Sequence, residues 1–252
     1  MNNPTILITG GTGKFGRKYV EHFVRKGWTV LFTSTKEDRS NELKIVFGND
    51  PNLHGFVVDL SISSSISNFV QNISDKGFRV NHLVNNARSL HSLKVNETGI
   101  TSREDFLDEY LLDVIVPYEL AMALYGREPN SLLTVNNISS QYGVVATNPS
   151  LYDNHAIQSP IQYGVAKAAL NHLTKELAVR FADKGIRVNC IAYGGVEGRV
   201  DEEFKERYAR LTPIRRMLRE DDIAGPLDFL VSDSSSAMTG QTLIVDGGWS
   251  IW

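Results

Sequence analysis

The hydrophobic residues of the chain fall into short apolar runs that alternate with longer segments of helical periodicity. The first run, residues 5–9, is bounded by glycines and is typical of a strand buried on both faces. After it, Tyr19, Val20, Phe23 and Val24 recur at the spacing of a helix that packs on a sheet. The alternation predicts right-handed crossovers and a doubly wound parallel sheet between two layers of helices.

The same pattern can be followed to the end of the chain. After the first strand we expect six more strands, over residues 28–33, 55–58, 81–85, 132–136, 185–189 and 242–245. We expect helices over residues 37–46, 61–74 and 105–125, and a long helix around Tyr163. Pro117 would kink the third of these. No linker or repeat interrupts the pattern, so residues 1–252 are predicted to form a single Rossmann-like α/β/α domain with seven strands.

Composition and charge narrow the classes of partner. The net charge of −3 provides no basic surface for nucleic acid or for an acidic membrane. The single cysteine, Cys190, excludes an intrachain disulfide. The first residues have neither a basic region nor a long apolar stretch. We therefore expect a cytoplasmic protein that acts on a small molecule, with no metal site.

A glycine-rich segment follows the first strand. It reads Gly10-Gly11-Thr12-Gly13-Lys14-Phe15-Gly16 and leads into the first helix. In this context, glycines leave backbone N–H groups and a helix N-terminus open to an anion, so the segment predicts binding of a dinucleotide phosphate. The alternative is an ordinary turn.

Polar residues follow several of the other predicted strands. They include Asp59, the pair Asn85 and Asn86, the pair Ser139 and Ser140, and the run Tyr193-Gly194-Gly195. In a doubly wound sheet, ligands bind at the carboxyl ends of the strands, where these residues would collect.

Tyr163 and Lys167 are four residues apart in the predicted long helix and would face the same side. An ammonium group next to a phenol favours its ionised form, so the pair can exchange a proton. Ser140 could meet Tyr163 at one substrate oxygen. No G-x-S-x-G elbow surrounds Ser140, so hydride chemistry with a nicotinamide cofactor is favoured over a serine nucleophile.

These motifs together resemble the short-chain dehydrogenase/reductase family over nearly the whole chain. The motifs, in order, are Thr9-Gly10 to Gly16, Asp59-Leu60, Asn85-Asn86-Ala87, Ser139-Ser140, Tyr163 with Lys167, Arg187-Val188-Asn189, and Thr239 to Gly248. The resemblance implies that Tyr163 is the acid/base and that Ser140 orients the substrate oxygen. It implies that Lys167 lowers the tyrosine pKa and holds the nicotinamide ribose. Asp59 and Leu60 would contact the adenine, and Asn86, Ala87, Gly194 and Val196 would lie along the cofactor.

The chain also departs from the family pattern. Lys14 replaces a glycine of the first motif, and Arg88 replaces the glycine that closes N-N-A-G, beside the cofactor. Asp113 stands where the family has its catalytic asparagine, which puts the usual water relay in doubt. Tyr193 and Gly198 replace a proline and a threonine. These departures keep open an alternative, a nucleotide-binding regulator or scaffold without turnover.

The residues after the second strand bear on the cofactor. Ser34, Thr35 and Lys36 include no acid that would bond the 2′-hydroxyl of NAD, and Lys14 adds a second cation. We therefore expect NADP(H) to be preferred over NAD(H). In the alternative, both lysines are solvated and Glu37 or Asp38 reaches the ribose.

Two segments are candidates for substrate binding. Residues 141–162 form a longer and more polar segment than is usual in the family's shorter members, similar to that of reductases of bacterial surface-sugar synthesis, and they suggest a hydroxyl-rich substrate. Residues 197–220 hold six arginines that could clamp an anion or, alternatively, pair with neighbouring glutamates. The family resemblance implies a homodimer or homotetramer. Trp249 and Trp252 would suit a buried subunit contact, and the alternative is an ordinary hydrophobic terminus.

Overall fold

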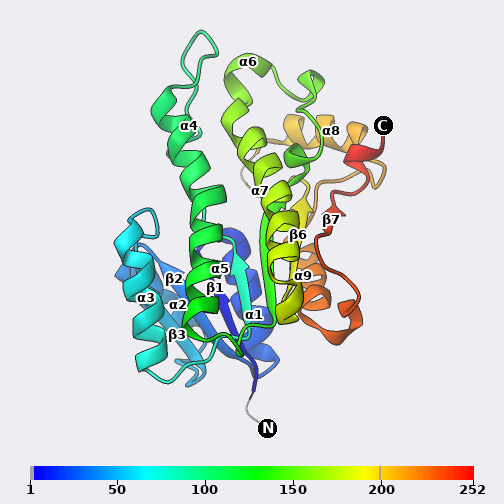
Figure 1. Cartoon of the computed structure of the whole chain (residues 1–252). Helices are drawn as coiled ribbons and strands as arrows, with labels where there is room; N and C mark the ends of the chain where they lie inside the picture. The colour runs from blue at the N-terminus through cyan, green and yellow to red at the C-terminus, as the bar shows by residue number, and fades with distance from the viewer. Residues whose placement is uncertain (1–2, 199) are drawn as a thin grey trace.

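A computed structural model of the chain describes residues 3–198 and 200–252. The strands are β1 (Thr5–Ile8), β2 (Thr29–Ser34), β3 (Leu53–Val57), β4 (His82–Asn85), β5 (Thr134–Ser140), β6 (Arg187–Tyr193) and β7 (Thr242–Val245). They form one parallel sheet in the order β3-β2-β1-β4-β5-β6-β7 (Figure 1). The predicted doubly wound, seven-stranded fold class is confirmed.

Two layers of helices cover the sheet. The helices are α1 (Lys14–Arg25), α2 (Glu37–Val46), α3 (Ser63–Asp75), α4 (Arg103–Tyr110), α5 (Val116–Arg127), α6 (His155–Gln158), α7 (Ile161–Arg180), α8 (Glu202–Leu211) and α9 (Ala224–Val231). One buried core joins the sheet to α3, α5 and α7, and a second joins the opposite face to α1, α2 and α9. No helix within the described part of the chain is long and apolar enough to cross a membrane.

The predicted bounds of α2 and β7 are confirmed, whereas β5 and β6 run further than expected. Their register continues to Ser140 opposite Tyr193. The buried amide nitrogens of β5 have partners inside the protein. Asn136 Nδ2 donates to Thr134 Oγ1, and Asn137 Nδ2 donates to Thr174 Oγ1 of α7, both at 2.9 Å. Because these donors are met inside the protein, the strand can continue beyond its apolar run.

The predicted helix over residues 105–125 is interrupted, which corrects the expectation of one kinked helix. Between α4 and α5, residues Leu111–Ile115 form a π-helical turn with Asp113 at its centre. Pro117 lies in the first turn of α5, where its missing N–H resets the hydrogen-bond pattern. A π turn inserts one residue and so redirects the side chains it carries. Asp113 is turned into the protein and is 2% exposed.

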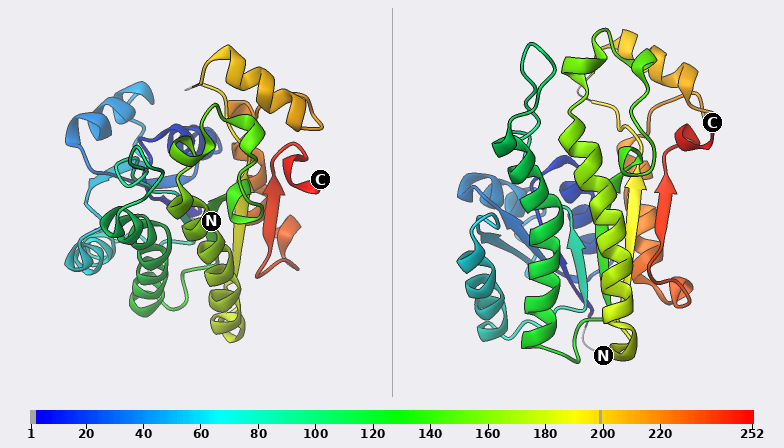
Figure 2. Two further views of the ribbon diagram at one scale, coloured as in Figure 1. Left: turned by 90° about the horizontal axis from the view of Figure 1, so that it is seen from above. Right: turned by 45° about the horizontal axis from the view of Figure 1, so that its top comes forward.

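The carboxyl edge of the sheet is covered by α6, α8 and the chain end, which lie together in Figures 1 and 2. A third, small core forms here around Leu151, Tyr208, Met217 and Trp249. Trp249 is 5% exposed and stacks on Tyr208 with ring centroids 4.6 Å apart. This chain already buries Trp249, so its burial does not require a second subunit. Trp252 is exposed, and its Nε1 donates to the Leu211 carbonyl.

Arg187, at the start of β6, fastens the segment after α9 to the sheet. Its guanidinium donates to the carbonyls of Leu230, Ser232 and Met238 and to Ser235 Oγ, at 2.9 to 3.4 Å. The four acceptors come from nine consecutive residues, so one side chain fixes the turn that leads from α9 to β7.

His82 of β4 predicts an acid-sensitive stability. It is buried, lies 2.9 Å from Thr134 Oγ1 and stacks on Trp28. Burial, and then the charge of Arg187, lower the pKa of His82 from 6.5 to about 4. Between these two pH values His82 is protonated in the unfolded chain but neutral in the folded chain. The stability that neutral His82 contributes is therefore complete above about pH 6.5 and declines as the pH falls to about 4. The loss amounts to about 3 kcal/mol.

Urea unfolding at a series of pH values measures this loss. His82→Gln should remove the loss between about pH 6.5 and 4, whatever its effect at neutral pH. His91→Gln, at an exposed position, is the matched control and should keep the wild-type dependence. Equal slopes for wild type and His82→Gln would contradict the assignment.

Candidate active site

The glycine-rich turn between β1 and α1 brings the backbone close to other segments. Gly10 has φ +66°, and a Cβ there would lie 2.9 Å from the Ala87 Cα. A Cβ on Gly16 would lie 2.2 Å from the Gly10 carbonyl oxygen. Gly13 caps α1 without a side-chain hydrogen bond, and no acidic residue occupies the first turn. A helix N-terminus so exposed fits the phosphates of a dinucleotide.

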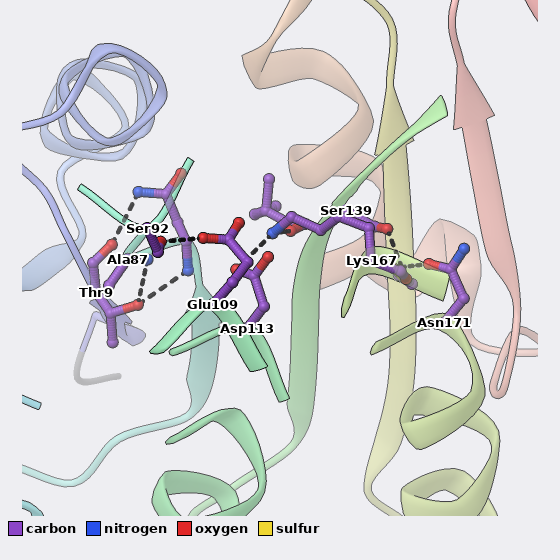
Figure 3. A network of polar contacts seen from close by, with 11 residues as sticks. Thr9, Ala87, Ser92, Glu109, Asp113, Ser139, Lys167 and Asn171 are labelled. Atoms are coloured by element: carbon purple, nitrogen blue, oxygen red, sulfur yellow. Dashed lines mark hydrogen bonds and ion pairs between the residues drawn. The ribbon is translucent and has the colours of Figure 1, made fainter. Parts of the chain in front are cut away.

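The loop after β4 is fastened to the end of β1. Thr9 Oγ1 accepts hydrogen bonds from the backbone N–H groups of Asn86 and Ala87, both at 2.9 Å. Asn86 Nδ2 donates to the carbonyls of Thr9 and Gly10. Asn86 and Ala87, both predicted to lie along the cofactor, therefore border the glycine-rich turn, as Figure 3 shows for Ala87 and Thr9.

The other predicted cofactor residues lie along the same edge of the sheet. Thr12 Oγ1 and Ser34 Oγ are 3.2 Å apart, and the backbone of Lys36 bonds to Ser34 Oγ, so these residues form one corner at the end of β2. Thr35 and Lys36 are exposed. After β3, Leu60 is buried, whereas Asp59 is exposed and accepts hydrogen bonds from Ser61.

Lys14 extends toward the segment after β6. Its amine donates to the Val196 carbonyl at 3.3 Å and would lie 3.0 Å from a Cβ on Gly198. It therefore links α1 to the segment after β6. Of the two lysines expected near a 2′-phosphate, only Lys36 lies at the end of β2.

Tyr193, which replaces a proline of the family pattern, faces the core. Its hydroxyl donates to the Ile223 carbonyl, and its ring meets Phe15 edge-on with centroids 5.1 Å apart. Gly194 follows it with little space, since a Cβ there would lie 2.9 Å from the Asp246 Cα. The turn after β6 is thus held by packing on both sides.

Lys167 bonds to three residues of the site. Its amine is buried, forms an ion pair with Asp113 Oδ1 at 2.8 Å and donates to the Ile138 carbonyl at 3.0 Å. Its own carbonyl accepts a hydrogen bond from Ser139 Oγ. The predicted relation between Lys167 and Tyr163 holds in space, with the amine 5.7 Å from the centre of the Tyr163 ring.

Ser140 ends β5 directly after Ile138 and Ser139, which both bond to Lys167 of α7. Its Oγ accepts from the Tyr142 N–H at 3.2 Å. The residues that follow pack directly on α7, since a Cβ on Gly143 would lie 2.8 Å from the Lys167 carbonyl, and one on Gly164 would lie 3.1 Å from that of Tyr142. The half-buried Tyr163 therefore borders the segment that begins at Ser140.

Two charged residues lie next to the residues just described, and only one of them was predicted from the sequence. Glu109, which sequence reasoning missed, is 1% exposed and accepts a hydrogen bond from Ser92 Oγ. Burial and then the negative charge of Asp113 raise the pKa of Glu109. Arg88, predicted to lie beside the cofactor, places its guanidinium carbon 4.7 Å above the centre of the Tyr163 ring.

The predicted substrate segment over residues 141–162 is ordered by its own polar side chains. The hydroxyls of Tyr142 and Tyr152 are 3.0 Å apart, and burial raises the pKa of both. Thr147 Oγ1 bonds to His155 Nε2 at 2.7 Å and accepts from Ser159 Oγ. The end of the segment is fastened by Gln162, whose amide donates to the carbonyl oxygens of residues 92 and 94.

The second predicted substrate segment, residues 197–220, contains α8 and packs on the first. Arg207 donates to the Leu151 carbonyl and forms ion pairs with Asp153 and Glu203. Arg216 is paired with Asp222. The alternative that neighbouring glutamates pair with the arginines is therefore confirmed for Arg207 with Glu203, whereas the partner of Arg216 is an aspartate. Arg199, another of the six, lies outside the described residues.

The chain was compared with known proteins. A family model described as "Enoyl-(Acyl carrier protein) reductase" matches residues 14–250. The chain is 27% identical over 257 residues to post-translational flagellin modification protein A of Campylobacter coli, covering 100% of both chains. It is 25% identical over 253 residues to the 3-oxoacyl-(acyl-carrier-protein) reductase FabG of Buchnera aphidicola subsp. Acyrthosiphon pisum, covering 98% of each.

A solved structure is also similar. The crystal structure of a short chain dehydrogenase from Leptospira borgpetersenii, with bound NAD+, matches with a TM-score of 0.88 and 25% identity, covering 99% of this chain and 94% of the other.

The buried ion pair between Lys167 and Asp113 predicts a large coupling between the two residues. Lys167→Met should lower the free energy of unfolding by about 3–5 kcal/mol, because it leaves the Asp113 charge buried without its partner. Lys167→Met combined with Asp113→Leu should recover much of that loss, because it removes the charge. Urea unfolding of the two single variants and the double variant measures the coupling.

The exposed pair of Lys205 and Glu202 provides the control. Lys205→Met should change stability little, since solvent screens a surface pair. Additive losses from the two buried substitutions would show that the ion pair does not couple them.

Proposed function

Because the chain belongs to the short-chain dehydrogenase/reductase family of oxidoreductases, we propose that it interconverts a secondary alcohol and a ketone on a polar, hydroxyl-rich small molecule such as a sugar derivative. The observation that carries the proposal is the arrangement of Tyr163 beside the buried amine of Lys167, next to the segment that begins at Ser140. A phenol with an ammonium group nearby is suited to give and accept a proton at neutral pH.

Each residue then has a role in the reaction. Ser140 binds the substrate oxygen and orients it. Tyr163 gives a proton to that oxygen during reduction and takes it back during oxidation. Lys167 places its positive charge beside Tyr163, where it would stabilise negative charge on the phenol oxygen during proton transfer, and Asp113 holds Lys167 in place from the π turn. A bound nicotinamide would donate or accept the hydride at the substrate carbon.

The proposed cofactor contacts follow the edge of the sheet. Gly10, Thr12, Gly13, Lys14, Phe15 and Gly16 would surround the phosphates. The adenine would lie against Asp59 and Leu60, and the rest of the cofactor along Asn86, Ala87, Arg88, Gly194, Val196 and the pair of Tyr163 and Lys167. The fit of the glycine-rich turn to an anion supports these contacts.

The proposed substrate class rests on the polar segment between Ser140 and Tyr163. Tyr142, Tyr152 and His155 give it several groups able to bond hydroxyls. The relative named for flagellin modification and the relative named as an acyl-carrier-protein reductase suggest different substrates. The substrate panel should therefore hold sugars, sugar phosphates, nucleotide sugars and acyl thioesters.

The whole chain is proposed to be one catalytic domain that works in the cytoplasm as a homodimer or homotetramer. The continuous sheet supports the single domain. The exposed Trp252 and the exposed apolar side chains of α5 and α7 leave surface for a subunit contact.

Tyr163→Phe tests the catalytic assignment. With a panel member that the wild type reduces, the variant should lose kcat by about 10²–10⁴-fold, because it lacks the proton that Tyr163 supplies. Binding of NADPH, measured by fluorescence, should change little. Tyr118→Phe, at an exposed tyrosine of α5, is the control. Undiminished turnover by Tyr163→Phe would overturn the proposal, and turnover of acyl thioesters alone would overturn the substrate class.

The preference for NADP(H) over NAD(H) is a separate proposal, based on Lys36 and on the hydroxyls of Ser34 and Thr35 at the end of β2. The dissociation constant for NADPH should be smaller than that for NADH. Lys36→Glu should reduce or reverse this preference for NADPH, because the new carboxylate repels the 2′-phosphate. Lys175→Glu, an exposed lysine of α7, controls for net charge. Tighter binding of NADH by the wild type would contradict the preference.

A further inference from the structure

Glu109 and Asp113 bring two carboxyl groups into the interior behind Tyr163. Glu109 is in the last turn of α4 and Asp113 is in the π turn that follows, and they are 1% and 2% exposed. Residues four apart on a helix face the same side. Figure 3 shows their carboxyl groups next to each other, with the amine of Lys167 beside them.

Each carboxyl group has one oxygen with a partner and one without. Glu109 Oε2 accepts from Ser92 Oγ, and Asp113 Oδ1 accepts from the Lys167 amine. Glu109 Oε1 and Asp113 Oδ2 are buried and have no hydrogen-bond partner among the residues that the structure describes. Two buried acceptors without a donor are costly, so a donor between them is expected.

The charges around the two carboxyl groups also favour a proton between them. Lys167 forms an ion pair with Asp113, and Arg88, the other cation that faces Glu109, is exposed and stacks on Tyr163. Two ionised carboxylates would leave one buried negative charge without a contacting cation. A single added proton leaves one negative charge for Lys167 and supplies the missing O–H donor.

We propose that Glu109 and Asp113 share one proton between these two oxygens, and that the singly charged acid pair positions Lys167 beside Tyr163. The role in catalysis rests on the proposed function, whereas the shared proton does not. The raised pKa of Glu109, caused by burial and then by the Asp113 charge, agrees with a carboxyl group that keeps its proton. Arg88 and Lys167 oppose that rise, and Ser92 opposes it through its hydrogen bond.

The proton determines the charge that Lys167 presents to Tyr163. While the pair carries one negative charge, the positive charge of Lys167 still favours the ionised phenol. When the pH rises and Glu109 loses its proton, a second negative charge faces Lys167 and weakens that effect. Turnover should then decline at alkaline pH, and Glu109 acts as a positioning residue that works through Lys167.

Infrared difference spectroscopy of the protein detects the proton without any turnover. With the carboxyl groups isotopically labelled, the wild type at neutral pH should show the C=O band of a buried protonated carboxyl group. Glu109→Gln should lack this band, and Glu104→Gln, at an exposed glutamate of α4, should keep it. Asp113→Asn should lose the band at a lower pH than the wild type, because the neighbouring charge is gone.

The pH dependence of kcat/KM tests the link to catalysis. In Glu109→Gln, the amide oxygen can accept from Ser92 and the amide N–H can donate to Asp113, as the protonated carboxyl group does, but the amide cannot ionise. Glu109→Gln should therefore lose the alkaline decline and should turn over about tenfold faster at neutral pH than Glu109→Leu, which lacks the donor.

The outcomes separate the two proposals. A wild type without the protonated carboxyl band would overturn the shared proton. Identical pH profiles for wild type and Glu109→Gln would overturn the positioning role of the pair. A normal band together with undiminished turnover by Tyr163→Phe would overturn only the proposed function.

Discussion

The buried ammonium group of Lys167 joins three separate elements of the fold. It extends from α7, forms an ion pair with Asp113 in the π turn and donates a hydrogen bond to the Ile138 carbonyl in β5. An ammonium group withdrawn from water is stable only when its donors and its charge are met. The position of each element is therefore tied to the others, and Tyr163, one helical turn before Lys167, is fixed by the same contacts.

Much of the fold could be predicted because the apolar runs are short and their periods are clear. The strand over residues 242–245 and the helix over residues 37–46 agree with the structure to the residue. The extension of β5 could not be predicted from polarity. Asn137 is buried there, and its hydrogen bond to Thr174 offsets the cost of removing its amide N–H from water. The π turn likewise depends on how α4 and α5 pack, which Pro117 alone does not specify.

The sequence identified candidate site residues that belong to a motif. It missed those whose burial or contacts depend on the surrounding fold. Glu109 stands among Glu104, Asp105 and Asp108, a run that is typical of a solvated helix face. Only the π turn and the contact with Ser92 make it an interior residue. In the same way, the sequence places Lys14 beside the cofactor but cannot say that its amine crosses to Val196.

The order of the strands has a consequence for how the protein folds. The central strand, β4, pairs with β1, which places Ile6 opposite His82. Asp113 and Lys167, which form the buried ion pair, are 54 residues apart in the chain. Contacts between such distant segments close long loops and slow the search for the native state. During synthesis, the glycine-rich turn can be built on β1, β2 and β4 before α7 has left the ribosome. The glycine-rich turn is then expected to form first, with α7 and its buried lysine joining it in a later and slower step.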